Sequence, residues 1–108
     1  MPLPVFREAD NGRTVNEEIG GRFCVELVEN GTTGYTWSRP EFDETRLLLE
    51  SDESVPAPGG AIGAGGVRRF VFQTKATGRA TVRLAYRRPW ETDAAPAARF
   101  ELTIVGSP

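Results

Sequence analysis

The feature that most limits the fold of this chain is how often glycine and proline interrupt it. The 108 residues include 12 glycines and 8 prolines. The runs between them are rich in β-branched and aromatic residues, as is typical of strands. No amphipathic helical pattern extends over three turns. We therefore expect a series of short strands, of which the clearest lie at 22–29, 35–39, 68–75, 80–86 and 99–105.

Alternation of apolar and polar residues supports three of these strands and predicts which side chains face a core. The residues that share a face are Phe70 with Phe72, then Val82 with Leu84 and Tyr86, then Phe100 with Leu102 and Ile104. Two weaker strands are expected. One lies at 45–50, where three leucines are equally compatible with one turn of helix. The other lies at 3–8 and is followed by a turn at Asn11-Gly12.

Some seven or eight short strands in a chain of this length predict an all-β fold, an immunoglobulin-like β-sandwich. Trp37 matches the buried tryptophan that such domains carry on their third strand. The apolar fraction of 39% suffices for one packed core, so residues 1–108 are expected to form a single domain.

The absence of histidine removes most catalytic chemistry. It excludes a Ser-His or Cys-His nucleophile pair, an imidazole general base and a His-ligated metal. The one cysteine, Cys24, lies in a half-buried strand pattern, where a small buried hydrophobe is expected and not a reactive thiol. Glu17, Glu18, Asp43, Glu44, Asp52 and Glu53 stand in polar settings, which leaves a carboxylate-dependent hydrolase as a weak rival. We expect no enzyme, no metal and no cofactor.

The charge balance limits the partners. Thirteen basic and fifteen acidic residues give a net charge of −2, whereas a nucleic-acid or membrane-surface binder is expected to be clearly basic. The N-terminal residues lack the apolar stretch of a signal peptide. We expect a monomer that is cytoplasmic as given, or periplasmic or secreted if a leader was removed.

Strand parity brings three connections to one end of the predicted sandwich. Each strand crosses the sandwich once, so the alternate connections 30–34, 54–67 and 87–98 share an end, while 40–44 and 76–79 lie at the other. Loops held on a rigid sheet commonly form binding sites.

The first two of these loops are rich in glycine and small residues. Asn30-Gly31-Thr32-Thr33-Gly34 is either a hairpin turn or, since such a turn does not need the further residues, a narrow uncharged wedge. The segment 58–67 lacks the strand-to-helix context and the lysine of a phosphate loop. It is either a mobile linker or a bare backbone that lies against another molecule.

The third loop contains Arg87-Arg88-Pro89-Trp90. Arginine beside tryptophan occurs in nucleic-acid sites, but the acidic balance of the chain argues against that interpretation. Tryptophan and arginine are also the usual anchors of protein interfaces.

These three segments, in this order and spacing, resemble the signatures of the chagasin-type inhibitors of papain-family cysteine proteases. The resemblance rests on 30–35 with Trp37, on Gly63-Ala64-Gly65-Gly66 and on Arg88-Pro89-Trp90, and it runs from about Phe23 to the C-terminus. It implies an immunoglobulin-like fold and tight, reversible inhibition of papain-like enzymes. The rival from another class is an adhesion or scaffold module that uses its sheet faces.

The resemblance also implies a role for each loop. The Thr-Thr loop enters the active-site cleft beside the catalytic cysteine, the glycine-rich loop lies across the cleft, and the Arg-Pro-Trp loop grips from one side. The protease-binding residues are then Asn30, Gly31, Thr32, Thr33, Gly34, Gly63, Ala64, Gly65, Gly66, Arg88, Pro89 and Trp90.

One position departs from the family pattern and generates a prediction. Gly31 stands where the family usually has proline, which fixes φ and reduces the freedom lost on binding. If φ at Gly31 is near −65°, Gly31→Pro should tighten protease binding by about 0.4–1 kcal/mol in an inhibition titration. We expect this shape because Thr32-Thr33-Gly34-Tyr35 keeps the pattern. If φ is positive, as Asn-Gly turns favour, the variant should instead weaken both folding and inhibition.

Overall fold

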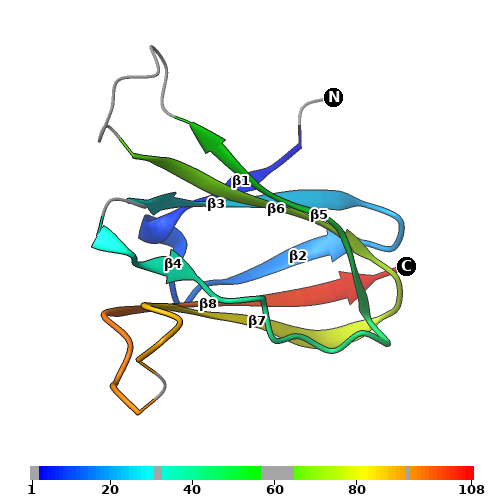
Figure 1. Ribbon diagram of the computed structural model, residues 1–108. Helices are drawn as coiled ribbons and strands as arrows, with labels where there is room; N and C mark the ends of the chain where they lie inside the picture. Colours follow the sequence, from blue (N-terminus) through cyan, green and yellow to red (C-terminus); the bar gives the residue numbers. More distant parts are fainter. Residues whose placement is uncertain (1–2, 31–32, 57–64, 92) are drawn as a thin grey trace.

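Two four-stranded sheets lie face to face in the computed structural model, which describes residues 3–30, 33–56, 65–91 and 93–108 (Figure 1). The first sheet has the order β1 (Val5–Phe6), β3 (Arg22–Glu29), β6 (Gly66–Thr74) and β5 (Leu47–Pro56). The second sheet has the order β2 (Thr14–Glu18), β8 (Ala98–Ser107), β7 (Gly78–Arg87) and β4 (Thr36–Trp37). The predicted all-β, immunoglobulin-like sandwich is confirmed.

The core lies between the sheets and is built from the predicted faces. Phe70, Phe72 and Leu102 have no exposed surface, and the other alternating side chains are buried or pack against the core. Trp37 is 4% exposed, and its indole N–H donates a hydrogen bond to the Val28 carbonyl oxygen at 2.9 Å. The indole therefore packs in the core and joins β4 of one sheet to β3 of the other.

The N-terminal part of the chain differs from the prediction. β1 pairs in parallel with β3, and β2, which was not predicted, pairs in parallel with β8. The short 3-10 helix Glu8–Asp10 and the turn at Asn11-Gly12 therefore connect two sheets and not two strands of a hairpin. Because of the added strand, Trp37 lies on the fourth strand and not the third.

The leucine triplet is strand and not helix, since it begins β5. Leu47 is buried and the next residue, Leu48, is 44% exposed, as alternation in a strand requires. β5 runs on to Pro56 and β6 begins at Gly66, so the predicted connection 54–67 is shorter than expected. In the part of the chain described here, no helix is long and apolar enough to span a membrane.

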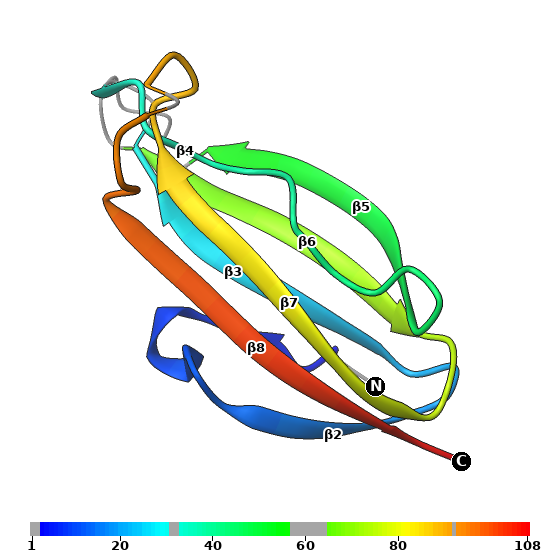
Figure 2. The same ribbon diagram turned by 90° about the horizontal axis from the view of Figure 1, so that it is seen from below.

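The three predicted loops share one end of the sandwich. Figure 1 and Figure 2 show that β3, β5 and β7 end and that β4, β6 and β8 begin at this end, while the β4–β5 and β6–β7 connections turn at the other. The parity prediction is confirmed. We call this end the three-loop edge; its described residues are 30, 33–35, 56, 65–66, 87–91 and 93–97.

Trp37→Ala should lower the free energy of unfolding by about 3–5 kcal/mol, because it leaves a large cavity and removes an indole hydrogen bond. Urea unfolding measures this loss. Leu48→Ala, on the exposed side of β5, is the matched control and should change stability by about 0.5 kcal/mol or less. Equal losses in the two variants would contradict the assignment of Trp37 to the core.

Candidate functional site

The structure describes eight of the twelve predicted binding residues, and all eight lie at the three-loop edge. They are Asn30, Thr33, Gly34, Gly65, Gly66, Arg88, Pro89 and Trp90. Gly31, Thr32, Gly63 and Ala64 lie outside the described residues, and so does the φ angle of Gly31 on which the proline prediction depends.

The first and third loops contact each other directly. Arg88 Nε donates a hydrogen bond to the Thr33 carbonyl oxygen at 3.0 Å. The Trp90 ring lies against the backbone of Gly34, whose φ is +81°, so closely that a Cβ at Gly34 would collide with it. Gly34 is therefore required both for its backbone angle and for the approach of the indole.

Trp90 is exposed, as predicted. Although one part of the ring covers Gly34, the residue is 68% exposed, the largest exposure among the large hydrophobic residues described. An exposed indole that already packs against another loop is a suitable anchor for a partner. Its side chain loses little conformational entropy when the partner binds.

Arg88 has three further contacts that hold it in place. Its guanidinium lies over the Tyr35 ring, 4.6 Å from the ring centre, and donates to Glu91 Oε1 at 3.1 Å. The Glu91 backbone N–H closes the turn onto the Arg88 carbonyl at 3.0 Å. These contacts indicate that Arg88 stiffens the edge internally, a role that the interface-anchor interpretation of the sequence did not include.

The second loop returns against the stem of the first. Gly65 has a φ of +72°, and an added Cβ there would lie 3.2 Å from the Glu29 carbonyl oxygen. The described parts of all three loops thus meet around the end of β3. A residue other than glycine at this position would be strained by its backbone angle and would crowd the Glu29 carbonyl.

Two tyrosines, which the sequence analysis missed as site residues, support the first loop. The Asn30 backbone N–H donates to the Tyr86 hydroxyl at 3.0 Å. The Tyr86 ring lies between two others, 5.5 Å from that of Tyr35 and 4.9 Å from that of Trp37. The sequence places Tyr35 at the start of the predicted strand 35–39 and Tyr86 at the end of the predicted strand 80–86. These positions alone do not show that the two rings meet.

A polar network that the sequence analysis also missed lies beneath the loops. Arg68 of β6 contacts Glu29 at 3.3 Å and binds both carboxylate oxygens of Asp52, at 2.5 and 3.1 Å. The other side of Glu29 accepts hydrogen bonds from the Thr36 hydroxyl at 2.6 Å and the Trp37 backbone N–H at 3.0 Å. The network therefore ties the stems of the first two loops to both sheets.

The hydrogen bonds at Glu29 change its protonation. Burial by itself raises the pKa of this carboxyl, but the bonds from Thr36 and Trp37 and the charge of Arg68 together bring the pKa below its usual value. Glu29 is thus ionised at neutral pH and provides a negative charge for Arg68.

Cys24 is buried, as predicted. It has no disulfide partner, and burial raises the pKa of its thiol. Burial limits access to the thiol and the raised pKa keeps it protonated, so it is unreactive.

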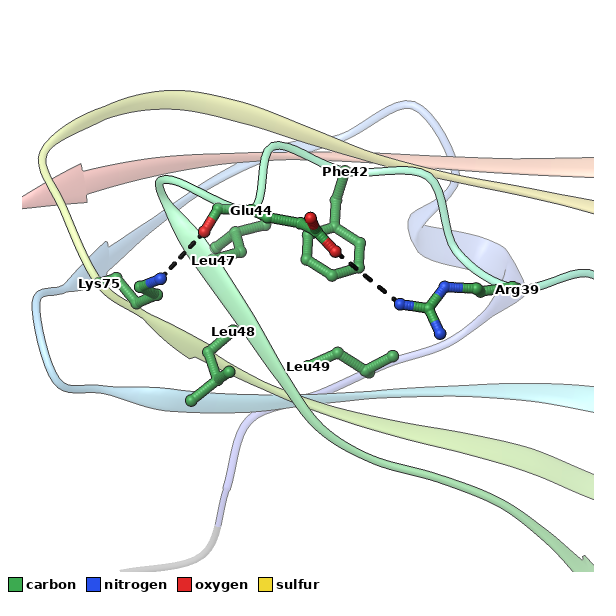
Figure 3. Close-up of a pocket in the computed structure, with 7 residues that line it drawn as sticks. All are labelled: Arg39, Phe42, Glu44, Leu47, Leu48, Leu49 and Lys75. Atoms are coloured by element: carbon green, nitrogen blue, oxygen red, sulfur yellow. Dashed lines mark hydrogen bonds and ion pairs between the residues drawn. The ribbon is translucent and has the colours of Figure 1, made fainter.

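A hollow at the open edge between the sheets lies apart from the three-loop edge (Figure 3). Phe42 and Leu49 give it an apolar floor. Its rim is internally paired, Arg39 with the Glu44 carboxylate at 3.8 Å and Lys75 with the Glu44 carbonyl at 3.0 Å. With one carboxylate in its lining, the hollow lacks the acid pair of a carboxylate-dependent hydrolase.

Comparisons with known proteins agree with this architecture. The chain matches the model of the chagasin family peptidase inhibitor I42 over residues 16–104. Chagasin of Trypanosoma cruzi is 30% identical over 101 residues, which cover 90% of this chain and 92% of the relative.

Two solved structures share the fold. The cysteine protease inhibitor EhICP2 from Entamoeba histolytica has a TM-score of 0.86 at 22% identity, covering 97% of this chain and 95% of the other. PbICP-C, solved in complex with falcipain-2, has a TM-score of 0.68 at 15% identity, covering 97% and 91%.

Glu29→Gln should lower the free energy of unfolding at pH 7 by about 1–2 kcal/mol, because charge-assisted hydrogen bonds are lost. Since the folded pKa lies below the unfolded value of about 4.3, the stabilisation by ionised Glu29 is present above that pH and disappears as the pH falls through the folded pKa. Urea unfolding at pH 7 and pH 3 should show the two proteins converging. Glu44→Gln, whose side chain is 75% exposed, is the control with little effect at either pH. A constant difference for Glu29→Gln would contradict this role.

Proposed function

Since this chain belongs to the chagasin family of peptidase inhibitors and is a cysteine protease inhibitor, not an enzyme, we propose that it fills the active-site cleft of papain-family proteases with its three-loop edge. The inhibition is tight and reversible, and residues 1–108 act as one inhibitor domain. The occluding residues are Asn30, Gly31, Thr32, Thr33, Gly34, Gly63, Ala64, Gly65, Gly66, Arg88, Pro89 and Trp90.

The observation that carries this proposal is the contact between the first and third loops in the free protein. Arg88 holds the Thr33 carbonyl and Trp90 covers Gly34. Loops that are already joined lose less conformational freedom when a protease binds, so more of the contact energy appears as affinity. A scaffold module that binds through its sheet faces would not need this arrangement.

The chemistry of the edge suits occlusion. The first loop is uncharged and narrow, and the Thr33 hydroxyl is turned back onto the Asn30 carbonyl at 3.0 Å. Such a loop can enter a cleft without leaving an unpaired charge there. Exclusion of substrate and water then suffices for inhibition, and no covalent bond to the enzyme is formed.

A protein partner is supported by one fold neighbour. PbICP-C was solved in complex with falcipain-2, so a domain of this architecture is able to hold a second protein. The buried thiol of Cys24 argues against a mixed disulfide with the enzyme, in keeping with reversible binding.

Trp90→Ala should weaken inhibition of papain by about 2 kcal/mol or more, roughly thirtyfold in Kd, because it removes the exposed anchor of the third loop. The melting temperature should change little, since the residue is mostly exposed. Titration of active-site-calibrated papain measures the first quantity and thermal unfolding the second.

Ile19→Ala is the matched control for Trp90→Ala. Ile19 is also an exposed hydrophobic residue, 44% exposed, but it lies at the end opposite the three-loop edge. Its variant should inhibit like the wild type, and so should a folded Cys24→Ser protein. Equal inhibition by the wild type and Trp90→Ala would overturn the proposed use of this edge, and the scaffold alternative would then be favoured.

A further inference from the structure

The outer face of the second sheet carries a row of arginines. The inward positions of β7 are the core residues Ala80, Val82 and Leu84, so alternation places Arg79, Arg83 and Arg87 on the outside. On the neighbouring strand β8, Arg99 stands opposite Ala85, which belongs to the same outward series. Figure 2 looks onto this face, with β7 and β8 side by side and the third loop continuing from their upper ends.

Three of these arginines surround a hollow. Its volume is about 330 Å³, and Arg83, Arg87 and Arg99 line it around Ala85. The small side chain of Ala85 lies between larger neighbours and leaves the space open. A hollow bordered by guanidinium groups is suited to carboxylates, which arginine binds through two parallel hydrogen bonds.

The acidic residues of this hollow gather at the end away from the loops. Glu101 stands opposite Arg83 in the strand register and pairs with it at 3.6 Å, and Glu41 forms a backbone bridge with Arg83 from the other side. Arg87 stands opposite Thr36, and Arg99 opposite Ala85. Across the described residues neither Arg87 nor Arg99 has an ion-pair partner, so the uncompensated charge lies at the base of the third loop.

The first sheet does not show this imbalance. On its outer face Arg22 pairs with Glu50 at 2.6 Å, and Arg69 pairs with Glu26 at 3.4 Å. The whole chain carries a net charge of −2. Among the described residues Lys75 and Arg79, at the opposite end of the sandwich, also lack an ion-pair partner, but Arg87 and Arg99 line one hollow together, at the base of the third loop.

We propose that Arg87 and Arg99 form an anion-binding exosite, continuous with the third loop, that holds carboxylates on the rim of the target protease's cleft. This inference rests on the proposed function. It adds that the inhibitor prefers proteases with carboxylates beside the cleft. The two guanidinium groups attract an acidic rim during the encounter and so raise the association rate. Target proteases with acidic residues beside the cleft are thereby favoured over those with basic ones.

The first arm of the test is a direct binding measurement that needs no protease. A fluorescent hexaglutamate peptide should bind the wild-type protein at low ionic strength. The Arg87→Gln/Arg99→Gln variant should have lost most or all of its affinity for this peptide. The matched control is Arg79→Gln. It lies on the same face of the same strand but eight residues away, about 26 Å along β7, too far for a carboxylate held by Arg87 and Arg99 to contact it. The Arg79→Gln protein should bind the peptide like the wild type, and thermal unfolding should show that all three proteins are folded.

The second arm measures the association rate with a papain-family protease that has acidic residues beside its cleft. At 20 mM salt the double variant should associate about three- to tenfold more slowly than the wild type, and at 500 mM salt the two rates should converge. The difference should vanish with an enzyme variant in which the acidic rim residues are changed to amides. The Trp90→Ala protein, in contrast, should mainly dissociate faster.

The outcomes separate this inference from the proposed function. The exosite is refuted while inhibition stands if the double variant and Arg79→Gln bind hexaglutamate alike, or if the double variant associates as fast as the wild type at 20 mM salt. It is also refuted if the amide-rimmed enzyme shows the same difference in rate. If the wild-type protein binds hexaglutamate but does not inhibit, the proposed function fails and the role of the exosite fails with it.

Discussion

The contact between Arg68 and Glu29 is the interaction on which the three-loop edge depends. Arg68 reaches from β6 to Asp52 on β5, to Glu29 at the end of β3, and to the Thr36 hydroxyl and the Trp37 carbonyl on β4. The side chains of Arg68 and Glu29 are only 20% and 12% exposed. If Arg68 were removed, Glu29 would keep a poorly hydrated negative charge without its cationic partner, which costs more than the pair contributes. Arg68 itself would still be paired with Asp52 if Glu29 were removed. The stems of the loops are thus held together by ion pairs between strands that are distant in sequence, and not by interactions within each loop.

Above this network, packing determines which atoms the edge presents. The rings of Tyr35, Tyr86 and Trp37 form one contiguous group, in which Tyr35 and Tyr86 are stacked and Trp37 is tilted against Tyr86. Arg88 covers Tyr35 and Trp90 covers Gly34, so the third loop rests on the first. A surface supported in this way can exclude a substrate without reacting, because binding requires little rearrangement of the loops. In the free protein the Trp90 indole exposes apolar surface to water, which is unfavourable. A partner that covers the indole buries this surface and so gains binding free energy.

The edge and the sheet face beside it have different electrostatic characters. The described part of the first loop is uncharged, and the one arginine of the third loop's motif, Arg88, is paired with Glu91. Arg87 and Arg99, at the base of that loop, are not paired in the described part of the chain. Uncharged loop tips suit the interior of a cleft, where desolvation of charge is costly, whereas charges at the periphery act through water and mainly affect the encounter.

The sequence by itself determined the fold class, the buried faces of the strands, the contrast between Trp37 and Trp90 and the gathering of three loops at one end. These follow from alternation, turn residues and strand parity, which are properties of neighbouring residues. Only the tertiary structure decided that β1 and β2 join different sheets, that Arg68 meets Glu29 across 39 residues of chain, and that Glu101 stands opposite Arg83 and leaves Arg87 and Arg99 uncompensated. Such pairs depend on the register between strands that are distant in sequence. Local periodicity says which face a side chain occupies but not which residue lies across from it.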